Sequence, residues 1–127
     1  ASGSSVSDIA AYACQFVGNP YVAGGTSLTN GADCSGFVMS VFAQFGYSLP
    51  RVAADQYYQS VQKSVADLEP GDLVFYGSGI SHVALYIGDG QIIHASTSAS
   101  GIKISNYDYE TPVGVGTYIE SDGFYGE

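Results

Sequence analysis

The clearest structural signal in this sequence is residues 82–95, HVALYIGDGQIIHA, which read as two β-strands joined by a tight turn. A three-residue loop over 88–90 with Gly90 in the left-handed conformation is a common hairpin connection, and it pairs Ala84 with His94. Because side chains alternate along a strand, His82 and His94 then lie on one face as diagonal neighbours, roughly 7–8 Å apart. A two-residue loop would place the histidines on opposite faces, so the strand register decides whether they can act together.

The segments around this hairpin predict an α+β protein with an antiparallel sheet. The first half of the chain shows apolar residues at helical spacing, whereas the sequence after the turn signal Pro70-Gly71 reads as a series of short strands. Because the helices precede the strands instead of alternating with them, α+β is favoured over a parallel α/β fold. We expect helices at Ile9–Val17, Cys34–Phe45 and Ala53–Gln62, and strands at Leu73–Tyr76, His82–Ile87, Gln91–Ala95, Gly101–Ser105 and Val113–Ile119.

Length and composition predict one globular domain over residues 1–127, with its core at about 8–120. Hydrophobic residues make up 46% of the chain and charged residues 12%, which excludes intrinsic disorder. The apolar stretches are far shorter than the ~18 residues of a membrane helix, so we expect no membrane insertion. The formal net charge is −9 with only three basic residues, which cannot form the basic surface that nucleic-acid binding requires.

Cys34 is a candidate nucleophile because Asp33 before it is a good N-cap, which places the thiol in the first turn of a helix. Unpaired N–H groups and the helix dipole at this position favour a thiolate. A small buried cysteine is the competing interpretation. Cys14, inside the apolar first helix, is most simply a core residue. A Cys14–Cys34 disulfide is a further alternative, and it would remove the nucleophile.

The chain has only two histidines, and both lie on the predicted hairpin. A nucleophilic cysteine needs a base, and that base needs a third group to orient it, so Cys34, His82 and His94 could fill these roles in order. Structurally, His82 could instead cap a strand and His94 could be a hydrogen-bonded core residue. The spacing of these three residues matches no common zinc pattern, and we expect no metal site.

Several short motifs give the sequence a family resemblance. In chain order they are PYVAGG at 20–25, DCSGFV at 33–38, LPR at 49–51, LEPGDLVF at 68–75, HVALYIG at 82–88 and IIHA at 92–95. Together they resemble the NlpC/P60 family of bacterial cell-wall cysteine peptidases, over about Tyr12–Ser105. The resemblance implies a papain-like fold, in which a helix that carries the cysteine packs against an antiparallel sheet that carries the histidine.

The resemblance also implies catalytic roles. Cys34 would attack the scissile carbonyl, His82 would act as general base and acid, and His94 would orient His82. Tyr21 matches the family tyrosine expected near the oxyanion, where the Cys34 backbone N–H is a second candidate donor. No metal or organic cofactor is implied.

Three further residues match family positions for peptide recognition, including recognition of a free N-terminal amine. These are Asp33, Ser35 and Arg51, whose structural alternatives are an N-cap, a small helix residue and a surface cation. The sequence departs from the family at Ala23, where Trp is usual, and at 52–54, where Ser or Thr is common after the arginine. These departures concern peptide specificity and leave the catalytic groups in place.

The function implied by the resemblance is a cysteine endopeptidase acting on peptidoglycan stem peptides or muropeptides, at the bond between D-γ-glutamate and diaminopimelate or lysine. The alternatives are a CHAP-like N-acetylmuramoyl-L-alanine amidase and an inactive wall-binding module that retains the fold. We expect a monomer that is secreted or associated with the bacterial cell wall, with any wall-targeting domain outside this chain.

Overall fold

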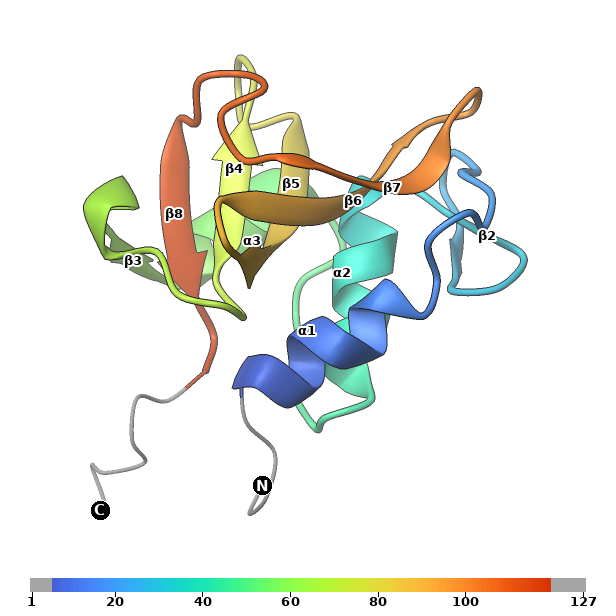
Figure 1. Ribbon diagram of the computed structural model, residues 1–127, viewed down its shortest axis with the longest axis horizontal. Helices are drawn as coiled ribbons and strands as arrows, with labels where there is room; N and C mark the ends of the chain where they lie inside the picture. Colours follow the sequence, from blue (N-terminus) through green and yellow to red (C-terminus); the bar gives the residue numbers. More distant parts are fainter. Residues whose placement is uncertain (1–5, 120–127) are drawn as a thin grey trace.

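The computed structural model describes residues 6–119 and confirms the predicted α+β class: helices cover a six-stranded antiparallel sheet (Figure 1). The helices are α1 (Val6–Cys14), α2 (Cys34–Ala43) and α3 (Ala53–Gln59), with a 3-10 turn at Val65–Asp67. The strands are β1 (Thr26–Ser27), β2 (Gly31–Ala32), β3 (Val61–Lys63), β4 (Leu73–Tyr76), β5 (His82–Gly88), β6 (Gln91–Thr97), β7 (Gly101–Asn106) and β8 (Gly114–Thr117). The large sheet has the order β3-β8-β4-β5-β6-β7, and β1 pairs with β2 separately.

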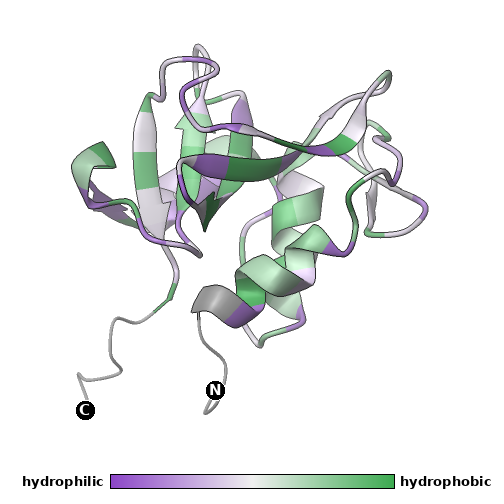
Figure 2. Cartoon of the chain, in the orientation of Figure 1, coloured by the Kyte–Doolittle hydropathy of each residue, from purple (hydrophilic) through white to green (hydrophobic). Residues whose placement is uncertain are grey.

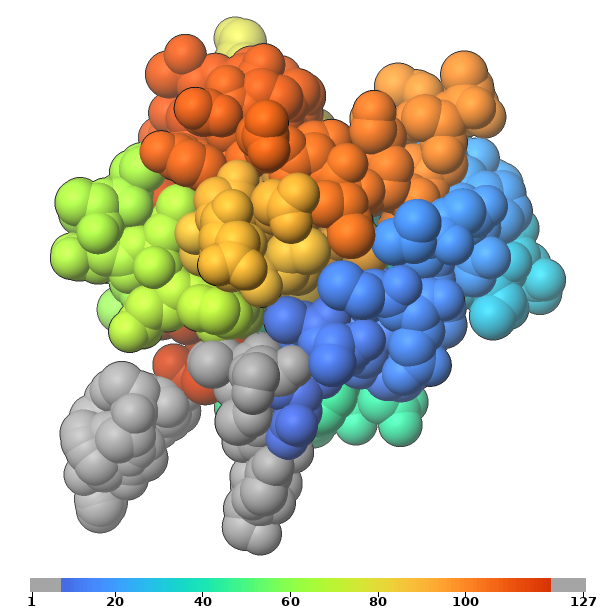
Figure 3. Space-filling view, in the orientation of Figure 1, coloured from blue at the N-terminus to red at the C-terminus, as the bar shows by residue number. Residues whose placement is uncertain are grey.

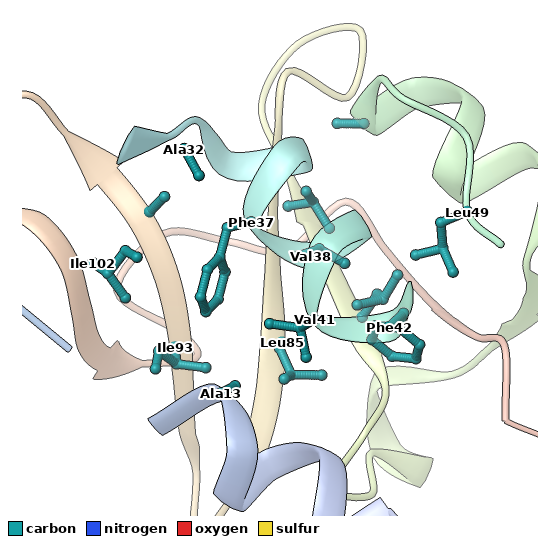
Figure 4. Packing of buried hydrophobic residues seen from close by; sticks show 14 of the residues in the cluster. Ala13, Ala32, Phe37, Val38, Val41, Phe42, Leu49, Leu85, Ile93 and Ile102 are labelled. Carbon is teal, nitrogen blue, oxygen red and sulfur yellow. The ribbon is translucent and has the colours of Figure 1, made fainter. Parts of the chain in front are cut away.

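The main core lies between α2 and one face of the sheet. Figure 4 shows Phe37, Val38 and Val41 of α2 packed toward Leu85 and Ile93 of the sheet. All five side chains are fully buried, and each contributes about 1.5–3 kcal/mol through the hydrophobic effect. The hydrophobic colour in Figure 2 accordingly concentrates on α1, α2 and the inner strands.

The opposite face of the sheet has its own small apolar cluster. It comprises Val74, Tyr76, Ala84 and Ile92, which alternate along their strands with residues of the main core. His82 and His94 share this second face, because each lies two residues from a member of the cluster on the same strand. The histidines therefore lie on the face opposite the main core.

The β5–β6 hairpin reaches the expected register by an unexpected route. Leu85 pairs with Ile93, which places Ala84 opposite His94 as predicted. The loop itself has two residues, since Gly88 pairs with Gln91 and the residues between them have φ of 55° and 76°. The prediction of a three-residue loop was therefore wrong, although its left-handed Gly90 is confirmed. The register shifts between Tyr86 and Gly88, so one extra residue bulges on β5 and offsets the shorter loop.

Other boundaries differ where pairing between distant segments outweighs local preference. The third helix ends at Gln59, three residues before the predicted end, because Val61–Lys63 pairs with β8 as an edge strand. The first helix ends at Cys14, and turns follow it. The short β1–β2 pair lies in the segment before α2, where Thr26 pairs with Ala32. No helix within residues 6–119 is long and apolar enough to cross a membrane.

The segment between α1 and α2 is attached to the far edge of the sheet. Gly18 N–H donates to Ile102 O at 2.8 Å, and Ile102 N–H donates to Asn19 O at 2.9 Å. Figure 3 shows the blue N-terminal segment lying against the orange segment around β7. Tyr21 then forms a parallel bridge with Ala32, which brings it beside the start of α2.

Candidate active site

The start of α2 is held rigidly by its cap. The Asp33 carboxylate accepts a hydrogen bond from Gly36 N–H at 2.8 Å, which confirms the predicted N-cap. Gly36 has no room for a side chain, because a Cβ atom there would overlap the Gly25 carbonyl oxygen. The loop that contains Gly25 therefore packs directly on the first turn of the helix and fixes the position of Cys34, the first helical residue.

The thiol of Cys34 lies against the backbone on either side of His82. Its Sγ is 3.9 Å from Ser81 O, and the backbone N–H of Val83 also faces the sulfur. Burial raises the pKa of the Cys34 thiol above its ordinary value, and this effect outweighs the backbone N–H groups of Val83, Ser35 and Cys34, which lower it. The expected preference for a thiolate at the helix start is thus overcome by burial, and the resting side chain is a thiol.

His82 and His94 form a hydrogen-bonded pair. Nε2 of His82 lies 2.7 Å from Nδ1 of His94, and the ring centroids are 5.0 Å apart. Burial lowers the pKa of His82, and burial together with the charges of His82 and Lys103 lowers the pKa of His94 to about 4. Both rings are therefore neutral at pH 7. The pairing uses Nε2 of His82 and leaves Nδ1 as the ring nitrogen that can exchange a proton with a thiol.

Ser105 and two tyrosines complete the surroundings of this pair, and the sequence motifs had not indicated them. Ser105 Oγ lies 3.0 Å from His94 Nε2. The ring of Tyr76 is 5.9 Å from that of His82, and the ring of Tyr109 is 5.3 Å from that of His94. Locating Ser105 from the sequence would have required the register of β6 with β7. That register shifts after Ala95, so counting residues from the β6–β7 turn gives the wrong partners.

The predicted recognition residues Asp33, Ser35 and Arg51 come together as one cluster. The Arg51 guanidinium donates to both carboxylate oxygens of Asp33, at 3.1 and 3.0 Å, and to Ser35 Oγ at 2.9 Å. Burial alone would raise the pKa of Asp33, but the hydrogen bonds from Arg51 and from the N–H groups of Gly36 and Gly24 lower it. Asp33 is therefore ionised at pH 7, and its side chain is 18% exposed.

Tyr21 lies close enough to Cys34 and Asp33 to sense their charges. Burial raises the pKa of the Tyr21 hydroxyl, and the charges of Cys34 and Asp33 raise it further. The phenol consequently stays protonated and can donate a hydrogen bond near the sulfur.

The remaining titratable groups of the described chain form no metal centre. Within residues 6–119, no group of three or more His, Cys, Asp or Glu side chains is placed to hold a metal ion. Cys14 and Cys34 are both free thiols, so the alternative of a disulfide between them does not hold.

Comparison with known proteins identifies the family of this chain. Residues 18–114 match the NlpC/P60 family. The "probable endopeptidase p60" of Listeria seeligeri is 46% identical over 100 residues, which cover 77% of this chain and 18% of that protein. The γ-D-glutamyl-L-lysine dipeptidyl-peptidase of Bacillus subtilis is 43% identical over 94 residues, which cover 70% of this chain and 31% of that protein. This chain thus spans less than a third of either relative.

A solved structure gives the same result for the fold. The crystal structure of an NlpC/P60 family protein from Bacillus cereus superimposes with a TM-score of 0.87 at 29% identity, covering 92% of this chain and 41% of that one. With a family match over most of its length and the same fold as a solved member, this chain belongs to the NlpC/P60 family.

Proposed function

We propose that this chain is a cysteine endopeptidase that hydrolyses peptidoglycan stem peptides at the bond between D-γ-glutamate and a diamino acid, diaminopimelate or lysine. One arrangement carries the proposal. His82 is neutral and hydrogen-bonded to His94, and the Cys34 thiol lies against the backbone next to His82. The choice of bond rests on family membership and on the printed name of the Bacillus subtilis relative.

The proposed reaction begins with the thiol and the imidazole both neutral. Nδ1 of His82 takes the Cys34 proton as the sulfur attacks the γ-carbonyl carbon, and a thioester forms when the C–N bond breaks. The imidazolium returns the proton to the departing amine. Water then attacks the thioester with His82 again acting as base, which releases the acid and restores the thiol. Because the pKa of His94 is only about 4, the positive charge stays on His82, next to the reacting groups.

Two donors would stabilise the oxyanion that forms during attack. The Cys34 backbone N–H is one, since the first N–H groups of a helix have no partner within the helix. The Tyr21 hydroxyl is the other, because it remains protonated close to the sulfur. Donors of this kind are worth roughly 3 kcal/mol each in other enzymes.

The cluster of Asp33, Ser35 and Arg51 would bind the N-terminal end of the peptide. Asp33 is ionised, partly exposed and adjacent to the nucleophile in sequence, so a free amine two residues before the scissile bond could pair with it. Arg51 and Ser35 would hold the carboxylate in position for that contact.

The setting we propose is the bacterial cell wall, with the chain acting as a monomer and secreted or associated with the wall. Its net charge of −9 gives little attraction to an anionic wall. Binding would therefore come from the candidate active site itself, or from a targeting domain in another part of the protein.

Defined muropeptides test the proposal. The protein is incubated with L-Ala-γ-D-Glu-diaminopimelate, the lysine analogue and a disaccharide-linked stem peptide, and the products are identified by mass. We expect free L-Ala-D-Glu from wild type and from Cys14→Ala, the matched control, and no product from Cys34→Ala. Release of an intact stem peptide from the sugar would instead support the amidase. Equal behaviour of wild type and Cys34→Ala would overturn the peptidase proposal and support an inactive binding module.

A further inference from the structure

We propose that Ser105 is a positioning residue: its hydroxyl offers an acceptor to Nε2–H of His94, which would otherwise be buried and unpaired, and so stabilises the tautomer that gives His82 a free ring nitrogen toward Cys34. The inference rests on the proposed function for its kinetic consequence, but the tautomer it specifies can be measured without any substrate.

The position of Ser105 is set by the β6–β7 ladder. His94 pairs with Lys103, and Ser105 lies two residues further along β7, diagonally across from His94 on the same face. The diagonal brings Ser105 Oγ to 3.0 Å from His94 Nε2. Since His94 is only 1% exposed, bulk water cannot readily take the place of the hydroxyl. Ser105 is half-buried, so it closes the inner end of the Cys34–His82–His94 series.

The hydrogen-bond series has two possible proton arrangements, and only one suits the reaction. When Ser105 Oγ accepts from Nε2–H of His94, Nδ1 of His94 carries a lone pair and accepts from Nε2–H of His82. Nδ1 of His82 is then unprotonated and can accept the thiol proton. In the reverse arrangement His94 donates from Nδ1, His82 carries its proton on Nδ1, and that nitrogen cannot act as a base.

A neutral hydroxyl suits this position better than a carboxylate would. A carboxylate at 105 would stabilise a charged His94 and raise its pKa, so the proton taken from Cys34 could pass to the inner ring. With a serine, the pKa of His94 remains at about 4 and the proton stays on His82, from which the leaving amine must collect it. Ser105 therefore supplies orientation without adding charge.

The variants that test this role differ by one group. Ser105→Thr keeps the hydroxyl, and Ser105→Val has nearly the same shape without it, so both place the same β-branched bulk on the strand. Ser98→Ala, at an exposed serine in the β6–β7 loop, serves as the control. Because the chain contains only two histidines, ¹⁵N labelling of histidine gives a spectrum of two rings, and Ser105 variants can be compared directly.

We expect wild type, Ser105→Thr and Ser98→Ala to show His94 protonated at Nε2 at pH 7. Ser105→Val should populate the Nδ1-protonated form and should lower kcat about tenfold, with KM nearly unchanged, as expected for the loss of one buried hydrogen bond. Alkylation of Cys34 by iodoacetamide, followed on the Cys34 peptide, should slow to a similar degree.

The readouts separate the two proposals. If wild type cleaves no stem peptide but Ser105→Val changes the tautomer and slows alkylation, the inference stands and the proposed function fails. If wild type cleaves stem peptides while Ser105→Val retains both the tautomer and kcat, Ser105 has no positioning role. Protonation of His94 at Nδ1 in wild type would also overturn it. Should Ser105→Val not fold, the wild-type and Ser105→Thr spectra still decide the tautomer.

Discussion

His82 and His94 meet nitrogen to nitrogen, with Nε2 of the first 2.7 Å from Nδ1 of the second. The two rings are unequal partners. His94 is almost fully buried and its pKa is about 4, whereas His82 is only half-buried and is flanked by Ser81 and Val83, whose backbone contacts the thiol. This inequality keeps the proton on the outer ring, and it leads to the first two predictions.

The pH dependence of kcat/KM should show a broad plateau. The resting form requires a neutral His82, whose pKa is lowered from 6.5, and a protonated Cys34, whose pKa is raised from 9.0. Activity should therefore fall on the acid side below pH 6.5 and on the alkaline side above pH 9, as measured with a stem-peptide substrate after its own N-terminal amine has been titrated separately. An acid limb above pH 6.5 would contradict a neutral resting pair.

Stability should fall on acidification in a window set by His94. Its pKa is lowered from 6.5 to about 4 in the folded state, so the unfolded chain binds the extra proton more readily. The free energy of unfolding is therefore unaffected by protonation of His94 above pH 6.5. It falls by about 3 kcal/mol as the pH is lowered toward 4. Urea unfolding at pH 7 and pH 4.5 should show this loss in wild type and a smaller one in His94→Gln. An equal loss in both would show that other groups govern the acid sensitivity.

Tyr21→Phe should lower kcat by about a hundredfold, because it removes one oxyanion donor and keeps the ring. The KM for the stem peptide and the unfolding midpoint should change little. Tyr12→Phe, on α1, is a matched control that removes a hydroxyl away from the site. If Tyr21→Phe has the same kcat as that control, the Tyr21 hydroxyl does not contact the oxyanion.

Asp33→Asn should raise KM by up to about fivefold for peptides with a free N-terminal amine, since it removes one charge of the partly exposed ion pair between Asp33 and that amine. Asn and Asp are similarly good N-caps, so α2 and the placement of Cys34 should be retained. The comparison is made between a free and an acetylated stem peptide on both proteins. A KM increase of equal size for the two peptides would mean that Asp33 acts only on the fold and not on the amine.

The elements that depend on local chemistry were predictable from the sequence. Asp33 caps α2 through its own side chain, and the alternating strands around His82 and His94 are confirmed. What local patterns could not supply was pairing between distant segments. Val61 pairs with Thr117, which ends the third helix early, and Ser105 reaches His94 only through the β6–β7 ladder. The ion pair between Asp33 and Arg51 likewise forms only when the loop before α3 packs against the start of α2.

The bulge on β5 offsets the short turn of the β5–β6 hairpin. The two-residue turn and the extra residue each shift the pairing by one position, and together they restore the parity that keeps His94 on the face of His82. A single insertion or deletion in this hairpin that no further bulge offsets would move one histidine to the other face of the sheet, whereas a change of two residues would preserve the pair. Length variation between Gly88 and Gln91 should therefore occur in even steps among active relatives that keep the bulge on β5.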